Sequence, residues 1–221
     1  MDIYPLGHSS FRIKGKGAIV VTDPFDSGAV GLKFPKLEAA DIITISHDHP
    51  DHNASSAVLE KIGADAKPFI VDGPGEYEIK EVTILGIPSF HDGKSGEERG
   101  KNTIYVFTVD GLRLCHLGDL GHKLTDEQVE EIGSVDILFI PVGGHFTIDA
   151  KVAAEVVAQI EPTIVIPMHY QRAGLSKDFA EVLAPVGQFL KEMGAEAIVP
   201  ESKYSTSKDK LPETTTVVVL E

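Results

Sequence analysis

Five potential metal ligands lie within the six residues from His47 to His52. The segment reads His-Asp-His-Pro-Asp-His and follows directly on a largely apolar run, 41–46. Neutral imidazole nitrogens and carboxylate oxygens are donors that zinc, iron and manganese prefer in proteins. A buried strand that ends in such a turn would present these donors from a rigid edge. The pattern therefore favours a metal site over a solvated polar loop.

Three further candidate ligands each follow an apolar run that is expected to form a strand. They are His91, Asp119 and His169. If these strands belong to one sandwich of sheets, their ends can lie at a common edge. The three side chains would then face the same cleft as the segment His47 to His52. Such a spread-out set is weak evidence alone, but the dense cluster before it makes the metal site the preferred interpretation.

The elements that must position these side chains alternate between strands and helices. The dipeptide Asp110-Gly111 indicates a hairpin between two of the strands. Thr125 and Gln128 have the spacing of a capping box that opens a short helix. Asp149 is expected to cap another helix. We expect strands at 11–14, 18–22, 42–46, 69–71, 77–79, 82–87, 103–109, 112–117, 137–140, 163–166, 197–199 and 215–220, and helices at 55–62, from 125, at 150–159 and at 178–193.

Two stretches of the chain resemble each other. The run 41–45 is similar to the run 136–140, and a second apolar strand follows each run at the same separation, at 69–71 and at 164–166. The similarity predicts one domain, residues 1–221, built from two similar β-rich halves. Its fold class would be α/β, an αββα sandwich of two facing mixed sheets with helices on the outer faces. Coincidence between common strand–helix units is the alternative.

Composition limits the classes of partner and location. The chain has 221 residues and a formal net charge of −14, which would repel phosphate backbones and makes nucleic acid an unfavoured partner. An acidic nuclease with a small local basic patch stays open. The single cysteine, Cys115, lies in an apolar run and is interpreted as a core residue. We expect a cytoplasmic protein with no signal peptide and no membrane span.

In combination, these motifs resemble the metallo-β-lactamase fold superfamily, whose signature is His-x-His-x-Asp-His followed by a His, an Asp and a His. The resemblance covers nearly the whole chain. It is greatest to the branch that includes ascorbate-6-phosphate lactonase and related metal-dependent hydrolases. The motifs that carry it are Gly7 to Phe11, Asp23-Pro24, Gly118-Asp119, Pro141 to Thr147 and Pro167 to Tyr170.

The resemblance implies two divalent transition-metal ions, with Zn²⁺ favoured and Mn²⁺ or Fe²⁺ as alternatives. His49 bears on the chemistry, because redox-active diiron relatives carry an acidic residue there, so a histidine favours hydrolysis. By position, the ligands of one ion would be His47, His49 and His91, those of the other Asp51, His52 and His169, and Asp119 would bridge the two.

The implied activity is hydrolysis of a small ester, lactone or phosphodiester by a hydroxide bound to the two metals. Asp51 and Asp119 are the candidate catalytic residues. The substrate would be a small molecule, with an anionic one left open, and the resemblance also leaves a homo-oligomer open. The alternatives are a nuclease or phosphodiesterase of the same superfamily and a non-catalytic metal-dependent binding or sensing protein.

Four neighbouring residues are candidates for support of the ligands or for substrate contact. Asp23 is expected to hydrogen-bond to metal ligands rather than only to form a turn. His8 is expected to lie near the metals or the substrate, and His145 to line the cleft. Arg172 is a candidate anion binder, with a surface arginine as the alternative. His116, on an apolar strand, is expected to be a hydrogen-bonded core residue.

The glycine-rich loop from His91 to Asn102 has two interpretations. It carries Lys94, Arg99 and Lys101, and it could form a lid that supplies cations to an anionic substrate. A solvated charged loop is the alternative. Its composition does not distinguish the two.

Overall fold

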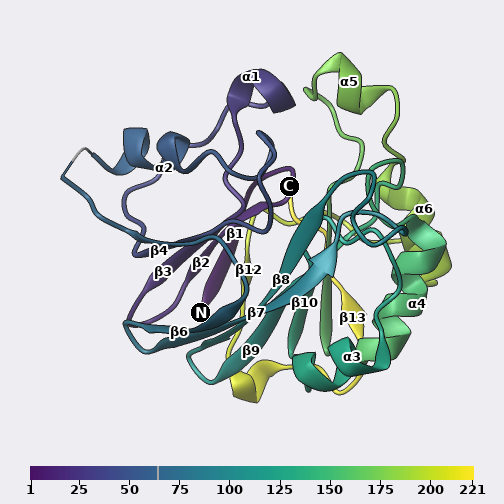
Figure 1. Cartoon of the computed structure of the whole chain (residues 1–221). Helices are drawn as coiled ribbons and strands as arrows, with labels where there is room; N and C mark the ends of the chain where they lie inside the picture. The colour runs from purple at the N-terminus through teal and green to yellow at the C-terminus, as the bar shows by residue number, and fades with distance from the viewer. Residues whose placement is uncertain (64) are drawn as a thin grey trace.

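Two mixed β-sheets pack face to face, and helices cover their outer faces (Figure 1). The structure is a computed structural model that describes residues 1–63 and 65–221. The strand order is β12-β1-β2-β3-β4-β5 in the six-stranded sheet and β13-β11-β10-β9-β8-β7-β6 in the seven-stranded sheet. This arrangement confirms the predicted αββα sandwich.

The six-stranded sheet is antiparallel from β1 to β3 and parallel from β3 to β5. The sequence pattern does not predict β1, because Pro5 interrupts its apolar alternation. The strands are β1 (Asp2–Gly7), β2 (Ser10–Lys14), β3 (Ile19–Thr22), β4 (Ile42–Thr44), β5 (Phe69–Val71) and β12 (Tyr204–Ser205).

The seven-stranded sheet is antiparallel from β6 to β9 and parallel from β9 through β10 and β11 to β13. The six-stranded sheet therefore contains three consecutive parallel strands, β3-β4-β5, and the seven-stranded sheet contains four, β9-β10-β11-β13. Two similar halves remain a prediction. The strands are β6 (Gly75–Ile79), β7 (Val82–Phe90), β8 (Lys101–Val109), β9 (Leu112–His116), β10 (Ile137–Pro141), β11 (Ile164–Met168) and β13 (Thr216–Val217).

The core is divided into layers by the two-residue period of the strands. In β10, Ile137 and Phe139 pack between the sheets, whereas Leu138 and Ile140 pack against the outer helices. Successive side chains of a strand point to opposite faces, so a strand that is covered on both faces is apolar throughout. Cys115 is fully buried among these side chains, as its apolar run predicts, and burial raises the pKa of its thiol.

The helices agree with most of the sequence expectations. Thr125 and Gln128 form the predicted capping box, and the Asp149 side chain accepts a hydrogen bond from Val152 N at the start of α4. Among the described residues, no helix is both long and apolar enough to cross a membrane. The helices are α1 (Ser27–Val30), α2 (Ser55–Ile62), α3 (Asp126–Ile132), α4 (Ala150–Ile160), α5 (Lys177–Ala180), α6 (Val186–Glu192) and the 3₁₀ turn η1 (Lys208–Lys210).

Two expectations near the C-terminus are wrong, and the strand predicted at 215–220 is too long. The single helix predicted at 178–193 is two helices, α5 and α6, because Pro185 lies between them. A proline has no backbone N–H to donate and disfavours helical geometry in the residue before it. The strand predicted at 197–199 is absent from this described segment, where Val199 is 80% exposed instead of packing in a sheet. The last strand is limited to β13.

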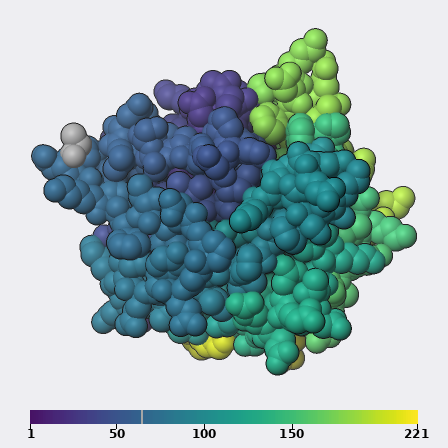
Figure 2. All heavy atoms as spheres, in the orientation of Figure 1, coloured from purple at the N-terminus to yellow at the C-terminus, as the bar shows by residue number. Residues whose placement is uncertain are grey.

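The α5 segment reaches back to the N-terminal part of the chain. Figures 1 and 2 show α1 and the α5 segment together at the top of the molecule. Ser176 N donates a hydrogen bond of 2.7 Å to Val30 O. A side chain at Gly31 would come within 2.3 Å of Ser176 N, and Gly31 has a φ of +89°. The close approach therefore requires glycine.

Tyr105 connects the two sheets beside the ligand segment. Its hydroxyl lies 2.9 Å from Ile45 O and 3.2 Å from Val71 O, both in the opposite sheet or at its edge. We expect Tyr105→Phe to lower the free energy of unfolding by about 1–3 kcal/mol, because buried carbonyls lose a donor. Urea unfolding of the metal-free protein measures this loss. Tyr77→Phe, which removes a more exposed hydroxyl, is the control. Equal unfolding midpoints for wild type and Tyr105→Phe would contradict the expectation.

Candidate metal centre

The candidate ligands meet at one edge of the sandwich. The turn after β4 supplies His47 to His52, and the loops after β7, β9 and β11 supply His91, Asp119 and His169. Ligand sites in sheets with parallel strands commonly lie beyond the carboxyl ends of those strands. The predicted convergence of strand ends thus brings all seven candidate ligands together.

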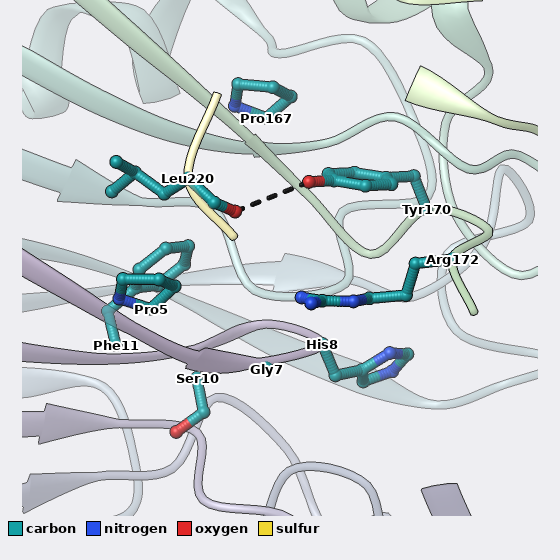
Figure 3. Close-up of a pocket in the computed structure, with 9 residues that line it drawn as sticks. All are labelled: Pro5, Gly7, His8, Ser10, Phe11, Pro167, Tyr170, Arg172 and Leu220. Atoms are coloured by element: carbon teal, nitrogen blue, oxygen red, sulfur yellow. Dashed lines mark hydrogen bonds between the residues drawn. The ribbon is translucent and has the colours of Figure 1, made fainter. Parts of the chain in front are cut away.

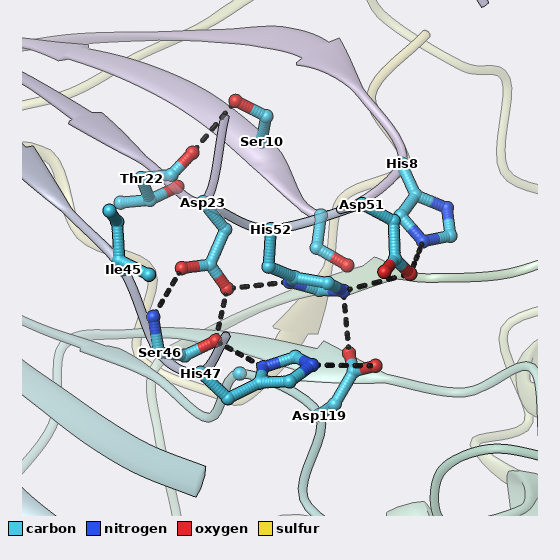
Figure 4. A network of polar contacts seen from close by, with 12 residues as sticks. His8, Ser10, Thr22, Asp23, Ile45, Ser46, His47, Asp51, His52 and Asp119 are labelled. Atoms are coloured by element: carbon cyan, nitrogen blue, oxygen red, sulfur yellow. Dashed lines mark hydrogen bonds and ion pairs between the residues drawn. The ribbon is translucent and has the colours of Figure 1, made fainter. Parts of the chain in front are cut away.

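Asp119 lies at the middle of this group. Its Oδ1 is 3.2 Å from His52 Nε2, and its Oδ2 is 3.2 Å from both His91 Nε2 and His169 Nε2. His47 Nε2 lies 3.9 Å from Oδ2 (Figure 4). Asp119 is only 1% exposed. One buried carboxylate therefore faces four imidazoles with both of its oxygens.

The donor atoms fall into groups whose members all lie within 4.8 Å of one another. The first group consists of the three histidines that the resemblance assigns to one ion. The second group consists of the three residues assigned to the other ion, together with His8. A third group joins the first two through Asp119. The groups are His47, His49 and His91; His8, Asp51, His52 and His169; and His47, His52 and Asp119.

The donor set passes a physical test for metal binding. Among the described residues, the buried His47 Nε2 has no hydrogen-bond partner, and the buried His52 Nε2 and Asp119 Oδ1 have only ion-pair contacts. Such atoms are costly unless something else satisfies them. Two ligand atoms about 2.1 Å from a tetrahedral zinc ion would lie roughly 3.4 Å apart. The Asp119 carboxylate oxygens lie at a similar distance, 3.2 Å, from the Nε2 atoms of three histidines. These residues therefore fit divalent transition-metal ions.

Asp23 holds two of the imidazoles from behind (Figure 4). His52 Nδ1 is 2.8 Å from Asp23 Oδ2, and the Ser46 hydroxyl donates to the same oxygen at 2.6 Å. His47 Nδ1 lies 3.0 Å from Ser46 Oγ. Because the Nδ1 atoms are engaged in these contacts, the Nε2 atoms of both histidines are left for the metal centre.

We expect Asp23→Asn to lower metal affinity by about 10–100-fold, the range observed when residues that orient metal ligands are changed. The amide cannot replace the carboxylate that accepts from His52 and Ser46. Competition with a chromophoric chelator measures the affinity, and the exposed Asp209→Asn is the matched control. Equal affinity of Asp23→Asn and wild type would show that Asp23 does not support the ligands.

Burial and neighbouring charge set the protonation of the site. Burial lowers the pKa of His47 to about 3 and that of His8 to about 4, so both imidazoles are neutral at neutral pH. Burial alone would raise the pKa of Asp51. The charge of His52 and the hydrogen bonds from His169, His52 and His8 lower it well below its usual range. Asp51 is therefore a carboxylate, and His47 and His8 have lone pairs to share.

Two other imidazoles carry protons in the absence of metal. Burial opposes the charged form of His52, but the Asp119 and Asp51 carboxylates raise its pKa well above the usual value. In the same way Asp119 raises the pKa of His169 to about 9. A metal ion must displace these protons, so metal binding is coupled to proton release.

The turn into Asp119 is fixed by a residue that the sequence did not single out. Asn102 Oδ1 accepts from Asp119 N at 3.0 Å, and its amide donates to Leu117 O at 2.9 Å. Gly118 has a φ of +56°, and a Cβ there would lie 2.3 Å from Asn102 Oδ1. Asn102 is the second residue of β8, directly after a polar loop, and it is buried. Nothing in the sequence around it indicates this burial.

Arg172 lies away from the open face of the metal centre. It lines a narrow cavity together with His8, Tyr170 and Leu220 (Figure 3). The Tyr170 hydroxyl is 3.5 Å from Leu220 O. Of this group, His8 also reaches the donor cluster, where its Nε2 is 3.2 Å from Asp51 Oδ2. Arg172 thus lies behind His8, and its role as an anion binder stays a prediction.

His145 and His116 lie in different surroundings. His145 is exposed and packs edge-on against Phe146, with ring centroids 4.5 Å apart. A cavity beside the metal centre, called the open cavity below, is lined by His49, Asp51, His91, Arg99, Asp119, Phe146 and Phe179. Phe146, and not its neighbour His145, is therefore the residue of this pair that lines it. His116 is fully buried, and its Nε2 is 2.9 Å from Ser9 O. It is the hydrogen-bonded core histidine that its strand predicts.

Comparison with known proteins identifies the class. The profile of the beta-lactamase superfamily domain matches residues 2–169. A crystal structure of a proposed Zn-dependent hydrolase of the metallo-β-lactamase superfamily from Thermotoga maritima is similar, with a TM-score of 0.78 and 35% identity, over 99% of this chain and 97% of that one. The chain therefore belongs to the metallo-β-lactamase superfamily, as its motifs predict.

Curated relatives of this chain are metal-dependent hydrolases. A UPF0173 metal-dependent hydrolase from Thermococcus onnurineus is 33% identical over 75% of this chain and 82% of the relative. Another from Carboxydothermus hydrogenoformans is 30% identical over 86% of this chain and 90% of the relative. In agreement with the sequence prediction, the chain is a metal-dependent hydrolase with a candidate metal centre of histidines and aspartates.

Proposed function

We propose that this chain hydrolyses a small ester, lactone or phosphodiester with two divalent transition-metal ions. The observation that carries the proposal is the position of Asp119, whose two carboxylate oxygens each face imidazoles of the cluster. Zn²⁺ is the favoured ion, with Mn²⁺ or Fe²⁺ as alternatives. One ion would be held by His47, His49 and His91, the other by Asp51, His52 and His169, and Asp119 would be shared.

The two ions, when bound, would supply Lewis-acid activation of water and of the substrate oxygen. The side chains around the ions would orient the water and the substrate. Asp51 is the ligand candidate best placed for a second role, because it lines the open cavity and its side chain is 13% exposed. His8 Nε2, 3.2 Å away, holds its carboxylate. We infer that Asp51 orients the attacking water or receives its proton.

The open cavity supports a small substrate. Its volume is about 240 Å³, below the range of roughly 300–1,000 Å³ that is usual for ligand pockets. Asp51 and Asp119 lie in its wall together with Phe146 and Phe179. A net charge of −14 disfavours the nuclease alternative, and the complete donor set disfavours a protein that binds metal without turnover. A cytoplasmic location and a homo-oligomeric state stay predictions.

The test is a substrate screen with protein reconstituted separately with Zn²⁺, Mn²⁺ and Fe²⁺. Esters, lactones and phosphodiesters of low molecular weight form the panel. We expect turnover of at least one class that depends on added metal and is lost in the presence of a chelator. Absence of turnover throughout the panel, with metal shown to be bound, would contradict the proposal and favour a binding or sensing protein.

A further inference from the structure

The open cavity beside the metal centre contains one cationic side chain among the described residues that line it, Arg99. Arg99 also lines a second cavity of about 430 Å³, and His49 is common to both. A substrate bound over the metal centre would therefore have a guanidinium at its side. The sequence identified Arg99 only as one of three cations in a loop.

The guanidinium of Arg99 has charge to offer a ligand. In the described part of the chain, Glu98 is the acidic residue within ion-pair distance, at 3.8 Å. Glu98 already makes a closer contact of 2.7 Å with Lys94. The Arg99 side chain is 33% exposed, so it is partly shielded from water. A guanidinium in such a position can bind a carboxylate through two parallel hydrogen bonds.

Asp92 fixes the loop that carries Arg99. Its carboxylate accepts from the backbone N–H groups of Lys94, Gly96, Glu98 and Arg99 at 2.8, 2.9, 3.0 and 2.7 Å. Asp92 itself is 4% exposed. One carboxylate thus satisfies four donors of a single loop, which sets the backbone position of Arg99 before any ligand binds. Preorganisation of this kind lowers the entropic cost of binding.

An apolar wall lies next to the cation. Phe146 and Phe179 pack edge-on with ring centroids 5.6 Å apart, and both line the open cavity. The Arg99 guanidinium carbon lies 5.9 Å from the Phe146 ring centroid. A ligand that touches this wall can therefore also reach the guanidinium. The juxtaposition suits a molecule that joins an apolar group to an anionic group.

We propose that Arg99 is a specificity-determining residue that selects substrates with a carboxylate on an apolar body, held against Phe146 and Phe179. Its part in hydrolysis rests on the proposed function above. Its part in binding does not, because the guanidinium and the apolar wall belong to the protein itself. Asp92 is a positioning residue that acts through the loop.

The binding test compares benzoate with isophthalate and terephthalate on metal-loaded protein by calorimetry. All three have an apolar ring and one carboxylate that can reach the metals, but only the last two have a second carboxylate for Arg99. We expect the better dicarboxylate to bind about tenfold more tightly than benzoate, or about 1.4 kcal/mol. Arg99→Gln should remove this preference.

Lys101→Gln is the matched control, because Lys101 is a neighbouring exposed cation that does not line the open cavity. It should keep the full preference. Asp92→Asn should reduce the preference for a dicarboxylate. It should also speed hydrogen exchange at the four backbone amides that Asp92 accepts from, those of Lys94, Gly96, Glu98 and Arg99. A loss of global stability would speed exchange throughout the protein and not only in this loop. Retention of the preference in Arg99→Gln, or its absence in wild type, would overturn the proposal.

A hydrolysis arm separates this proposal from the proposed function. 4-Acetoxybenzoate and its methyl ester contain the same aryl acetate bond and differ in the charge of the carboxyl group. We expect Arg99→Gln to lower kcat/KM for the charged ester about tenfold and to spare the neutral one. Equal effects on both esters would contradict the role of Arg99. No turnover of any substrate with the binding preference intact would contradict only the proposed function.

Discussion

Asp119→Asn is expected to abolish most hydrolysis and to lower the amount of metal bound per chain. The amide has lost the charge that faces His52, His91 and His169 at 3.2 Å. Removing one partner from a buried set of charges costs about 3–5 kcal/mol. The same energy lost from the transition state would slow the reaction by roughly 10²–10⁴-fold. Steady-state kinetics and elemental analysis of the same preparation measure the two effects.

The control for this change is Asp48→Asn. Asp48 is in the same ligand segment, but it is exposed and bonds to Asn53 at 2.6 Å. Its metal content and kcat/KM should stay close to those of wild type. If Asp119→Asn retained two ions and full activity, Asp119 could not hold the place between the ions that we assign to it.

Metal removal is expected to have the second largest effect, on stability. Without ions, the buried His47 Nε2 has no hydrogen-bond partner among the described residues. An ion at 100 times its Kd adds about 2.7 kcal/mol per site. For a domain of this size each kcal/mol raises Tm by about 2–4 °C. We therefore expect a rise of roughly 5–10 °C per occupied site in differential scanning calorimetry.

The choice of ions makes this experiment specific. Zn²⁺ and Mn²⁺ should raise Tm of chelator-treated protein, whereas Mg²⁺, which prefers oxygen ligands in octahedral geometry, should have a much smaller effect. In Asp119→Asn the rise with Zn²⁺ should shrink. Identical Tm values for metal-free and Zn²⁺-loaded wild type would mean that the cluster does not bind metal in the folded state.

The sequence predicts the layers and the positions of the candidate ligands for the same physical reason. Strands that are covered on both faces are apolar runs, and their ends can be read directly, as at β10 (Ile137–Pro141). The dense segment His47 to His52 follows such an end. The two helices α5 and α6 could not be separated as easily, because both sides of Pro185 carry helix-forming residues and the break depends on one proline.

The residues of the open cavity were harder to predict. Their positions depend on loop geometry, and a shift by one residue changes which side chain faces the ligand. His145 was expected in the cleft, yet Phe146 lines it, and His145 adopts a φ of +53° at this turn. Arg99 reaches the cavity from a loop that Asp92 organises through four backbone contacts. Composition alone does not reveal such contacts.

The central claim is that the histidine and aspartate cluster binds two ions that share Asp119. Anomalous X-ray diffraction at the metal absorption edge, on crystals of protein reconstituted with Zn²⁺, tests it most directly. We predict two anomalous peaks per chain, one beside His47, His49 and His91 and the other beside Asp51, His52 and His169, with Asp119 contacting both. A single peak, or two peaks of which only one contacts Asp119, would contradict the claim.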